Sequence, residues 1–197
     1  MAKISEFKSN MRGGGARPNQ FRVELSFPAD LNIPNAGLAA QAAQFLCDST
    51  SLPGSTIANV PVAYRGRTVN FAGERSFQPW NISVYTDTDF LIRNAMEKWQ
   101  SLVQNYASTE GVTNPSRYQA DMTVHQLDRN GGILKTYFFK DAYPTDIGAI
   151  QLSYGTDNQI ENFSVTFQYN YFTSDSTDQD NTAVSEIPLF PRDNRGV

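Results

Sequence analysis

The sequence of 197 residues has very little of the chemistry that enzymes use. It holds one cysteine, Cys47, and one histidine, His125. A single cysteine excludes an intrachain disulfide and a cysteine-based metal site. His125 stands in a strand-like segment without a partner at metal-ligand spacing, and no Ser/His/Asp or Cys/His set stands out. We therefore predict a protein that is not an enzyme and that uses no metal or cofactor.

Charge and long apolar runs are also scarce. Charged residues make up 18% of the chain, and the formal net charge is −4. A dedicated non-specific DNA-binding protein would be basic, so this composition argues against one. No apolar run reaches the length of a membrane span, and no apolar segment of the signal-peptide type follows the first residues. We expect no stable membrane binding and folding in a cytoplasm-like compartment.

What the sequence does have is period-two alternation of apolar and polar residues, which predicts strands with one buried face. It is clearest in the segments Phe21–Phe27, Trp80–Val84 and Phe163–Tyr171. Asn130-Gly131-Gly132 predicts a hairpin, because these residues adopt the positive φ of a tight turn. The last strand pair is predicted to join residues 149–155 to the segment beginning at Ile160.

One amphipathic helix is predicted from Thr88 to about Ala107. Its apolar residues form a single stripe at helical spacing: Ile92, Ala95, Met96, Trp99, Leu102, Val103 and Tyr106. Thr86, Asp87 or Thr88 can cap its start. Burying such a stripe stabilises a fold by about 1.5–3 kcal/mol per large side chain, so the helix is expected to pack on a sheet. The Ala/Gln run within residues 28–44 fits either a short helix or a surface loop.

Together these patterns predict a mainly β fold. The expected architecture is a β-sandwich or partly open barrel of roughly eight strands with one packed α-helix. Flexible N- and C-terminal arms flank it, the first ending in three glycines and the second rich in Ser, Asp and Thr with an apolar patch at Ile187–Phe190. The predicted organisation is an N-terminal arm of residues 1–15, a β domain of residues 16–172 and a C-terminal tail of residues 173–197.

Residues 48–73 form a long extended excursion with near-alternating apolar residues and a tip at Arg65-Gly66-Arg67. In an isolated subunit such an arm would leave apolar surface and backbone groups without partners, and contact with another copy would satisfy both. We therefore predict that Arg65, Gly66, Arg67 and also Arg17 contact neighbouring subunits or rings. The alternative is a plain surface hairpin.

Several segments, in order, carry a resemblance to a known family. They are "ARPNQFRVEL", "SLPG" followed by "PVAYRGRTVNFAGERSFQPWNISVYTD", "EKWQSL", "YPTDIGAIQLSY" and "NQIENFSVTFQYNY". In this order and spacing the sequence resembles the tail tube proteins of T4-like contractile-tailed bacteriophages. The resemblance covers most of the chain from Ala16 to Tyr171. It departs in the N-terminal arm, in an insert around residues 33–44 and in the tail after Phe172.

The resemblance implies a virion protein that is assembled in the cytoplasm of a host bacterium. Six copies would form a ring with a continuous inner β-barrel, and rings would stack into a tube inside a tail sheath. The implied partners are other copies, the sheath protein, baseplate or tube-initiator proteins, a tape-measure protein and the double-stranded DNA that passes through the lumen. Because a conduit must let DNA slide, we expect a lumen lined by acidic and neutral polar side chains.

Two alternatives share this implied fold: the tube protein of a phage-like contractile injection system, and a baseplate protein that initiates the tube. The number of copies in a purified particle separates an initiator from a tube subunit. A third alternative is a monomeric β-sandwich that binds carbohydrate or peptide. It requires a clustered aromatic pocket, whereas the aromatic residues here fall at periodic positions that face a core.

Overall fold

The structure is a computed structural model that describes residues 4–11, 13 and 15–177. Nine strands lie in this part of the chain. They are β1 (Phe21–Glu24), β2 (Cys47–Thr50), β3 (Ser55–Tyr64), β4 (Arg67–Phe77), β5 (Trp80–Tyr85), β6 (Ala120–Leu127), β7 (Ile133–Ile147), β8 (Asn162–Gln168) and β9 (Tyr171–Ser174). The helices are α1 (Ile4–Asn10), η2 (Ala29–Leu31), α2 (Ala36–Leu46), α3 (Leu91–Val103) and α4 (Pro115–Tyr118).

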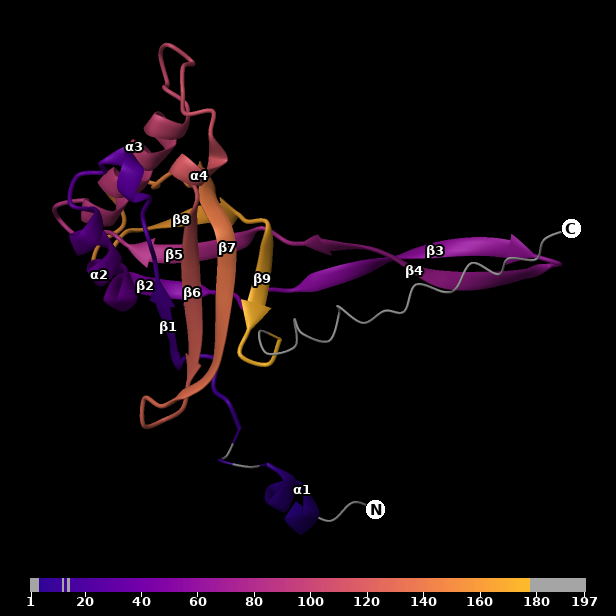
Figure 1. Cartoon of the computed structure of the whole chain (residues 1–197). Coiled ribbons are helices and arrows are strands. Elements are labelled where there is room, and N and C mark those ends of the chain that lie inside the picture. The colour runs from indigo at the N-terminus through magenta and orange to yellow at the C-terminus, as the bar shows by residue number, and fades with distance from the viewer. Residues whose placement is uncertain (1–3, 12, 14, 178–197) are drawn as a thin grey trace, which may run out of the picture.

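Seven strands form one antiparallel sheet in the order β1-β6-β7-β8-β5-β2, with β9 pairing to β7 off this path. The 15-residue β7 links two parts of the sheet, because its first half pairs with β6 and β9 and its second half with β8. In Figure 1 the strands β1, β6 and β7 run across the direction of β2, β5 and β8. The predicted mainly β fold is thus confirmed, with a large antiparallel sheet that folds over on itself.

An aromatic cluster fills the space between these two parts of the sheet. Trp80 of β5 stacks on Phe139 of β7 and lies against Phe167 of β8, with ring centroids 4.4 and 5.4 Å away. Trp99 of α3 reaches the same cluster through Phe167, at 6.3 Å. The alternation predicted for β5 is confirmed, since Trp80, Ile82 and Val84 are all buried.

Helix α3 covers the core as predicted, but it is shorter than Thr88 to Ala107. Its buried face is formed by Ile92, Ala95, Met96 and Trp99. The N-cap residue is Phe90, not Thr86, Asp87 or Thr88 as predicted, although Asp87 Oδ1 accepts a hydrogen bond from Leu91 N at 2.9 Å. Beyond its end, the Asn105 side chain accepts from the backbone N–H groups of Ala107 and Ser108 and holds a turn instead of helix. Tyr106, which the stripe included, is therefore exposed.

Several other elements were not predicted or were predicted differently. The Ala/Gln run is helix α2, whose Ala39 and Ala43 are buried. The N-terminal arm contains the short helix α1, in which no residue is buried. Residues 149–155, predicted as a strand, form none. Within the described residues they cannot pair with β8 as predicted, because β8 already pairs with β5 on one side and β7 on the other. The C-terminal patch at Ile187–Phe190 lies outside the described residues.

Candidate subunit-contact site

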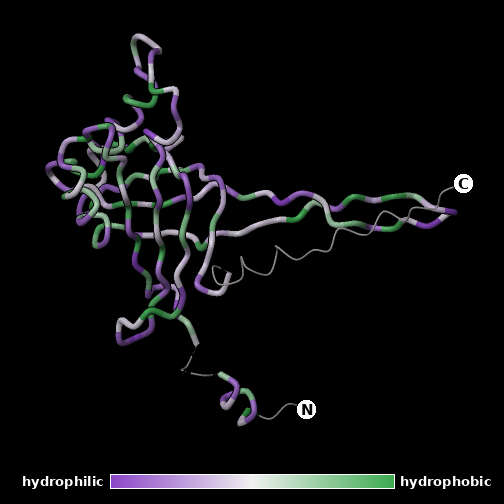
Figure 2. Tube along the Cα trace, viewed as in Figure 1, coloured by the Kyte–Doolittle hydropathy of each residue, from purple (hydrophilic) through white to green (hydrophobic). Residues whose placement is uncertain are grey.

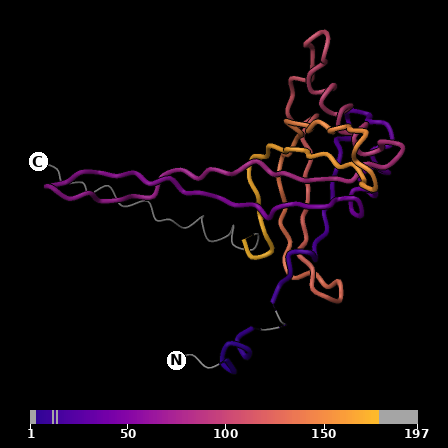
Figure 3. Tube along the Cα trace, turned by 180° about the vertical axis from the view of Figure 1, so that it is seen from behind, coloured from indigo at the N-terminus to yellow at the C-terminus, as the bar shows by residue number. Residues whose placement is uncertain are grey.

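The most prominent feature outside the core is the hairpin formed by β3 and β4, residues 55–77. Figures 1 and 3 show that it projects far from the body, on the side opposite α2 and α3. All ten residues of β3 are exposed. The hairpin is fastened at its base, where the ring of Phe77 lies 5.5 Å from Phe172 and 6.0 Å from Tyr169.

The tip lies at Arg65-Gly66-Arg67 as predicted, and it is a tight two-residue turn, which was not predicted. Tyr64 pairs with Arg67, so Arg65 and Gly66 alone connect the strands. Their φ angles are 49° and 79°, and two successive positive φ values are what a type I′ hairpin turn requires. The guanidinium of Arg65 lies 5.3 Å from the centroid of the Tyr64 ring. Two arginines are thus presented at the far end of a regular, narrow arm.

The register gives the hairpin two different faces. Directly opposed residues share a face, and so do alternate residues along a strand. One face therefore carries the pairs Val60–Phe71, Val62–Val69 and Tyr64–Arg67. The other face carries small and polar residues: Asn59, Pro61, Ala63, Thr68, Asn70 and Ala72. Figure 2 shows hydrophobic stretches along both strands of the hairpin.

Among the described residues, none covers the apolar face of the hairpin. Its five apolar residues, Val60, Val62, Tyr64, Val69 and Phe71, are between 43% and 62% exposed. Neither strand pairs with any other strand of the described chain, so the outer backbone edges are also open. Isolated β-proteins protect such edges, and unprotected ones pair with other chains. The arrangement therefore has the properties of a contact between copies.

The fourth predicted contact residue, Arg17, lies elsewhere. Its side chain is exposed, but its carbonyl accepts from Gln126 Nε2 at 2.8 Å and from Gln20 N at 3.2 Å. The backbone there is fixed to the body beside β1, and the structure does not bring Arg17 to the tip of the hairpin.

The single histidine has neighbours that the sequence could not indicate. His125 Nδ1 lies 3.0 Å from Thr136 Oγ1, and its Nε2 lies 3.5 Å from the Glu24 carboxylate. These residues come together through the pairings of β6 with β7 and β1. A hydroxyl, an imidazole and a carboxylate thus lie in a row, as in a catalytic triad. The Thr136 side chain is buried, however, so a substrate cannot reach its hydroxyl. The set holds three strands together.

The described residues show neither a metal-binding cluster nor a membrane-spanning helix. No group of three or more His, Cys, Asp or Glu side chains is placed to hold a metal ion within them. None of the helices described there is long and apolar enough to cross a membrane.

Comparison with solved structures defines the fold class. A chain in the cryo-EM structure of the anti-feeding prophage baseplate superposes with a TM-score of 0.58 and 15% identity, covering 81% of this chain and 95% of that one. A chain of the extracellular contractile injection system PVC, from its sheath–tube complex in the extended state, gives 0.53 and 14%, covering 88% and 98%. The chain thus has the fold of a subunit of contractile injection machines.

Comparison of sequences narrows this class. A family model described as phage tail tube protein matches residues 16–175. The tail tube protein gp19 of Enterobacteria phage T4 is 30% identical over 161 residues, 81% of this chain and 92% of gp19. The chain belongs to the phage tail tube protein family. It is a structural subunit of a contractile phage tail tube and a component of the virion tail, not an enzyme.

The baseplate tail-tube junction protein gp54 of T4 is also similar, at 29% identity over 116 residues. That match covers 59% of this chain but only 35% of gp54.

Proposed function

We propose that the body of residues 16–172 forms the wall of hexameric rings and that these rings stack into a hollow tube. The observation that carries this proposal is the β3–β4 hairpin, with its uncovered apolar face and open edges. A surface of this kind is stabilised when it packs on a second copy, and repeated packing of identical copies gives closed rings or helical stacks.

The partners follow from this role. Similarity to a chain in a sheath–tube complex and to a chain in a baseplate structure supports contacts with a tail sheath protein and with baseplate or tube-initiator proteins. A tape-measure protein and then double-stranded DNA occupy the lumen. We propose that acidic and neutral polar side chains line it, in keeping with the net charge of −4. A cryo-EM map with a bore lined mainly by Lys and Arg would contradict this lining.

Arg65, Gly66 and Arg67 are proposed to lie in the contact between copies. The test replaces Arg65 and Arg67 by Asp and keeps Gly66, so the turn can still form. The variant should remain folded, with unchanged circular dichroism and melting, but should not polymerise alone or on added baseplates. If it makes normal tubes, the contact lies elsewhere, and the terminal arms and Arg17 become the candidates.

The alternative role as a tube initiator is tested by counting copies. A tube subunit is present in many rings per particle, whereas an initiator supplies one ring. Quantitative gel analysis of purified virions, with the sheath protein as the reference, separates the two. The partial match to gp54 is the observation that keeps this alternative in view.

A further inference from the structure

The loop between β7 and β8, residues 148–161, is another large apolar surface that the described part of the chain leaves uncovered. Leu152, Tyr154 and Ile160 are 83%, 107% and 72% exposed, more than any apolar residue of the hairpin's apolar face. The loop encloses an open hollow of about 670 Å³, lined by residues from Ala149 to Asn162.

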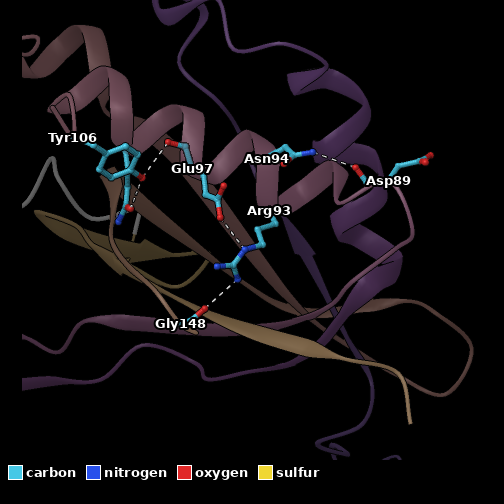
Figure 4. A network of polar contacts seen from close by, with 7 residues as sticks. Asp89, Arg93, Asn94, Glu97, Tyr106 and Gly148 are labelled. Carbon is cyan, nitrogen blue, oxygen red and sulfur yellow. Dashed lines mark hydrogen bonds and ion pairs between the residues drawn. The ribbon is translucent and has the colours of Figure 1, made fainter. Parts of the chain in front are cut away.

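Both ends of the loop are fixed to the body, although the residues in its middle are exposed. At its start, Gly148 N donates to Ser164 O at 2.7 Å, and Gly148 O accepts from Arg93 Nη1 at 3.1 Å. Figure 4 shows this bond, together with the ion pair between Arg93 and Glu97 on the same helix. At its end, Glu161 O accepts from Thr86 N at 2.9 Å. Both ends are therefore fixed to the body, and the apolar residues between them are presented outward.

The β7–β8 loop and the β3–β4 hairpin differ in charge. Residues 148–161 contain Asp157 and Glu161 and no lysine or arginine. The hairpin contains Arg65, Arg67 and Arg75 against one acidic residue, Glu74. None of Asp157, Glu161, Arg65 and Arg67 takes part in an ion pair within the described chain. The two surfaces are complementary both in charge and in apolar character.

Their positions are also complementary. Strand β4 leads into β5 through only Gln78 and Pro79, so the hairpin leaves the body at the first residue of β5. The β7–β8 loop meets Thr86, the residue that follows the last residue of β5. The two surfaces thus lie at opposite ends of one strand. Surfaces at opposite ends of a subunit cannot meet in the same copy, but they can meet head to tail between copies, which generates rings or helical stacks.

We propose that the β7–β8 loop of one copy is the docking site for the β3–β4 hairpin of the next copy. The apolar face of the hairpin covers Leu152, Tyr154 and Ile160, and the two tip arginines face Asp157 and Glu161. This inference rests on the proposed function, since it names the surface that receives the hairpin. It also explains why residues 149–155 have the alternation of a strand but no strand partner among the described residues.

The test is a charge exchange between the two surfaces. One variant carries Arg65→Asp and Arg67→Asp, a second carries Asp157→Arg and Glu161→Arg, and a third carries all four changes. Pelleting and negative-stain microscopy measure the amount of tube. Each double variant should lose at least about tenfold in tube yield, because opposed like charges cost more than the 1.4 kcal/mol that a factor of ten represents. The fourfold variant should recover most of the yield.

The matched control carries Arg117→Asp and Arg129→Asp, two exposed arginines outside both surfaces. It changes the net charge as much as the hairpin variant does and should assemble normally. If Asp157→Arg with Glu161→Arg assembles normally while the hairpin variant does not, the docking site is overturned and the tube function stands. If the unaltered protein forms no rings or tubes under any condition, including on baseplates, the proposed function itself fails.

A cross-link gives a second measurement that needs no charge change. In a Cys47→Ala background, copies with Val62→Cys are mixed with copies carrying Leu152→Cys, assembled and oxidised. We expect disulfide-linked dimers that contain one copy of each kind, and far fewer when the mixture is oxidised before assembly. Assembled tubes without such mixed dimers would overturn the docking site.

Discussion

The indole ring of Trp80 stacks on the phenyl ring of Phe139, with centroids 4.4 Å apart and ring planes 21° from parallel. Trp80 belongs to the part of the sheet that contains β5 and β8, and Phe139 to the part that contains β6 and β9. Tyr169 lies edge-on to Phe139 at 4.9 Å. This contact therefore joins the two crossing parts of the sheet at the centre of the body.

Replacing Phe139 by Ala should lower the free energy of unfolding by about 3–5 kcal/mol, because it removes a fully buried ring and leaves a cavity. Urea unfolding of the unpolymerised protein measures the change. Tyr154→Ala is the control: the same kind of truncation at a fully exposed position should change the stability by less than about 0.5 kcal/mol. Equal losses in both variants would show that the cluster does not hold the body together.

Replacing Gly66 by Ala should loosen the tip of the hairpin without melting the body. Gly66 has open space around it but a φ of +79°, a conformation that costs an L-residue about 1–2 kcal/mol. Amide hydrogen exchange of residues 55–77 should become faster, and polymerisation should weaken. The melting temperature should change little, because the hairpin lies outside the core.

Gly37→Ala is the matched control for this change. Gly37 also has open space, but it lies in helix α2 with an ordinary negative φ. The substitution should raise stability by about 0.4–1 kcal/mol, since alanine reduces the freedom of the unfolded chain. If Gly66→Ala behaved like Gly37→Ala, the tip would not depend on its left-handed backbone.

The thiol of Cys47 should react slowly in the folded protein. Burial, with a smaller contribution from the Asp48 carboxylate, raises the pKa of Cys47 from 9.0 to about 12. At pH 8 the thiolate then makes up about 10⁻⁴ of the folded protein, against roughly a tenth of the unfolded protein. A disulfide reagent such as DTNB should react with the folded protein at a rate that still rises with pH above 10. A plateau near pH 9 without urea would contradict the raised pKa.

The same pKa gives the sign of a pH effect on stability. Because the folded-state pKa of Cys47 lies above its ordinary value, the neutral thiol is the form that the fold favours. The stabilisation of the folded state by the neutral Cys47 thiol is complete below about pH 9 and is lost as the pH rises towards 12. Comparing urea unfolding of the natural protein and Cys47→Ala between pH 8 and pH 11 isolates this contribution, and Asp48→Asn should shift the loss to lower pH.

The sequence was informative where local chemistry decides the structure. The alternation around Trp80 predicted a half-buried strand, because a strand has a period of two. Arg65-Gly66-Arg67 was predicted to be the tip of the excursion but not a tight turn, which the positive φ angles of Arg65 and Gly66 make it. The excursion at residues 48–73 was also predicted to be extended, but its full length as a hairpin to Phe77 was not.

Several features that the sequence did not predict depend on contacts between segments that are distant in sequence. Residues 149–155 have the alternation of a strand, but whether such a segment becomes a strand depends on a neighbour that is distant in sequence. The approach of His125 to Thr136 and Glu24 likewise depends on strand order. The end of α3 could not be read from the apolar stripe, because the turn at Asn105 replaces the last helical residues.

The direct passage from β4 into β5 has a mechanical consequence. A pull on the hairpin tip travels along the covalent backbone through Gln78 and Pro79 into β5. There all six residues pair with β8, and β2 pairs on the other edge. Because the pull runs along the strand, it shears these hydrogen bonds together instead of opening them one after another. Tension between neighbouring copies would therefore be spread over the middle of the sheet, which suits a subunit of a contractile tail tube.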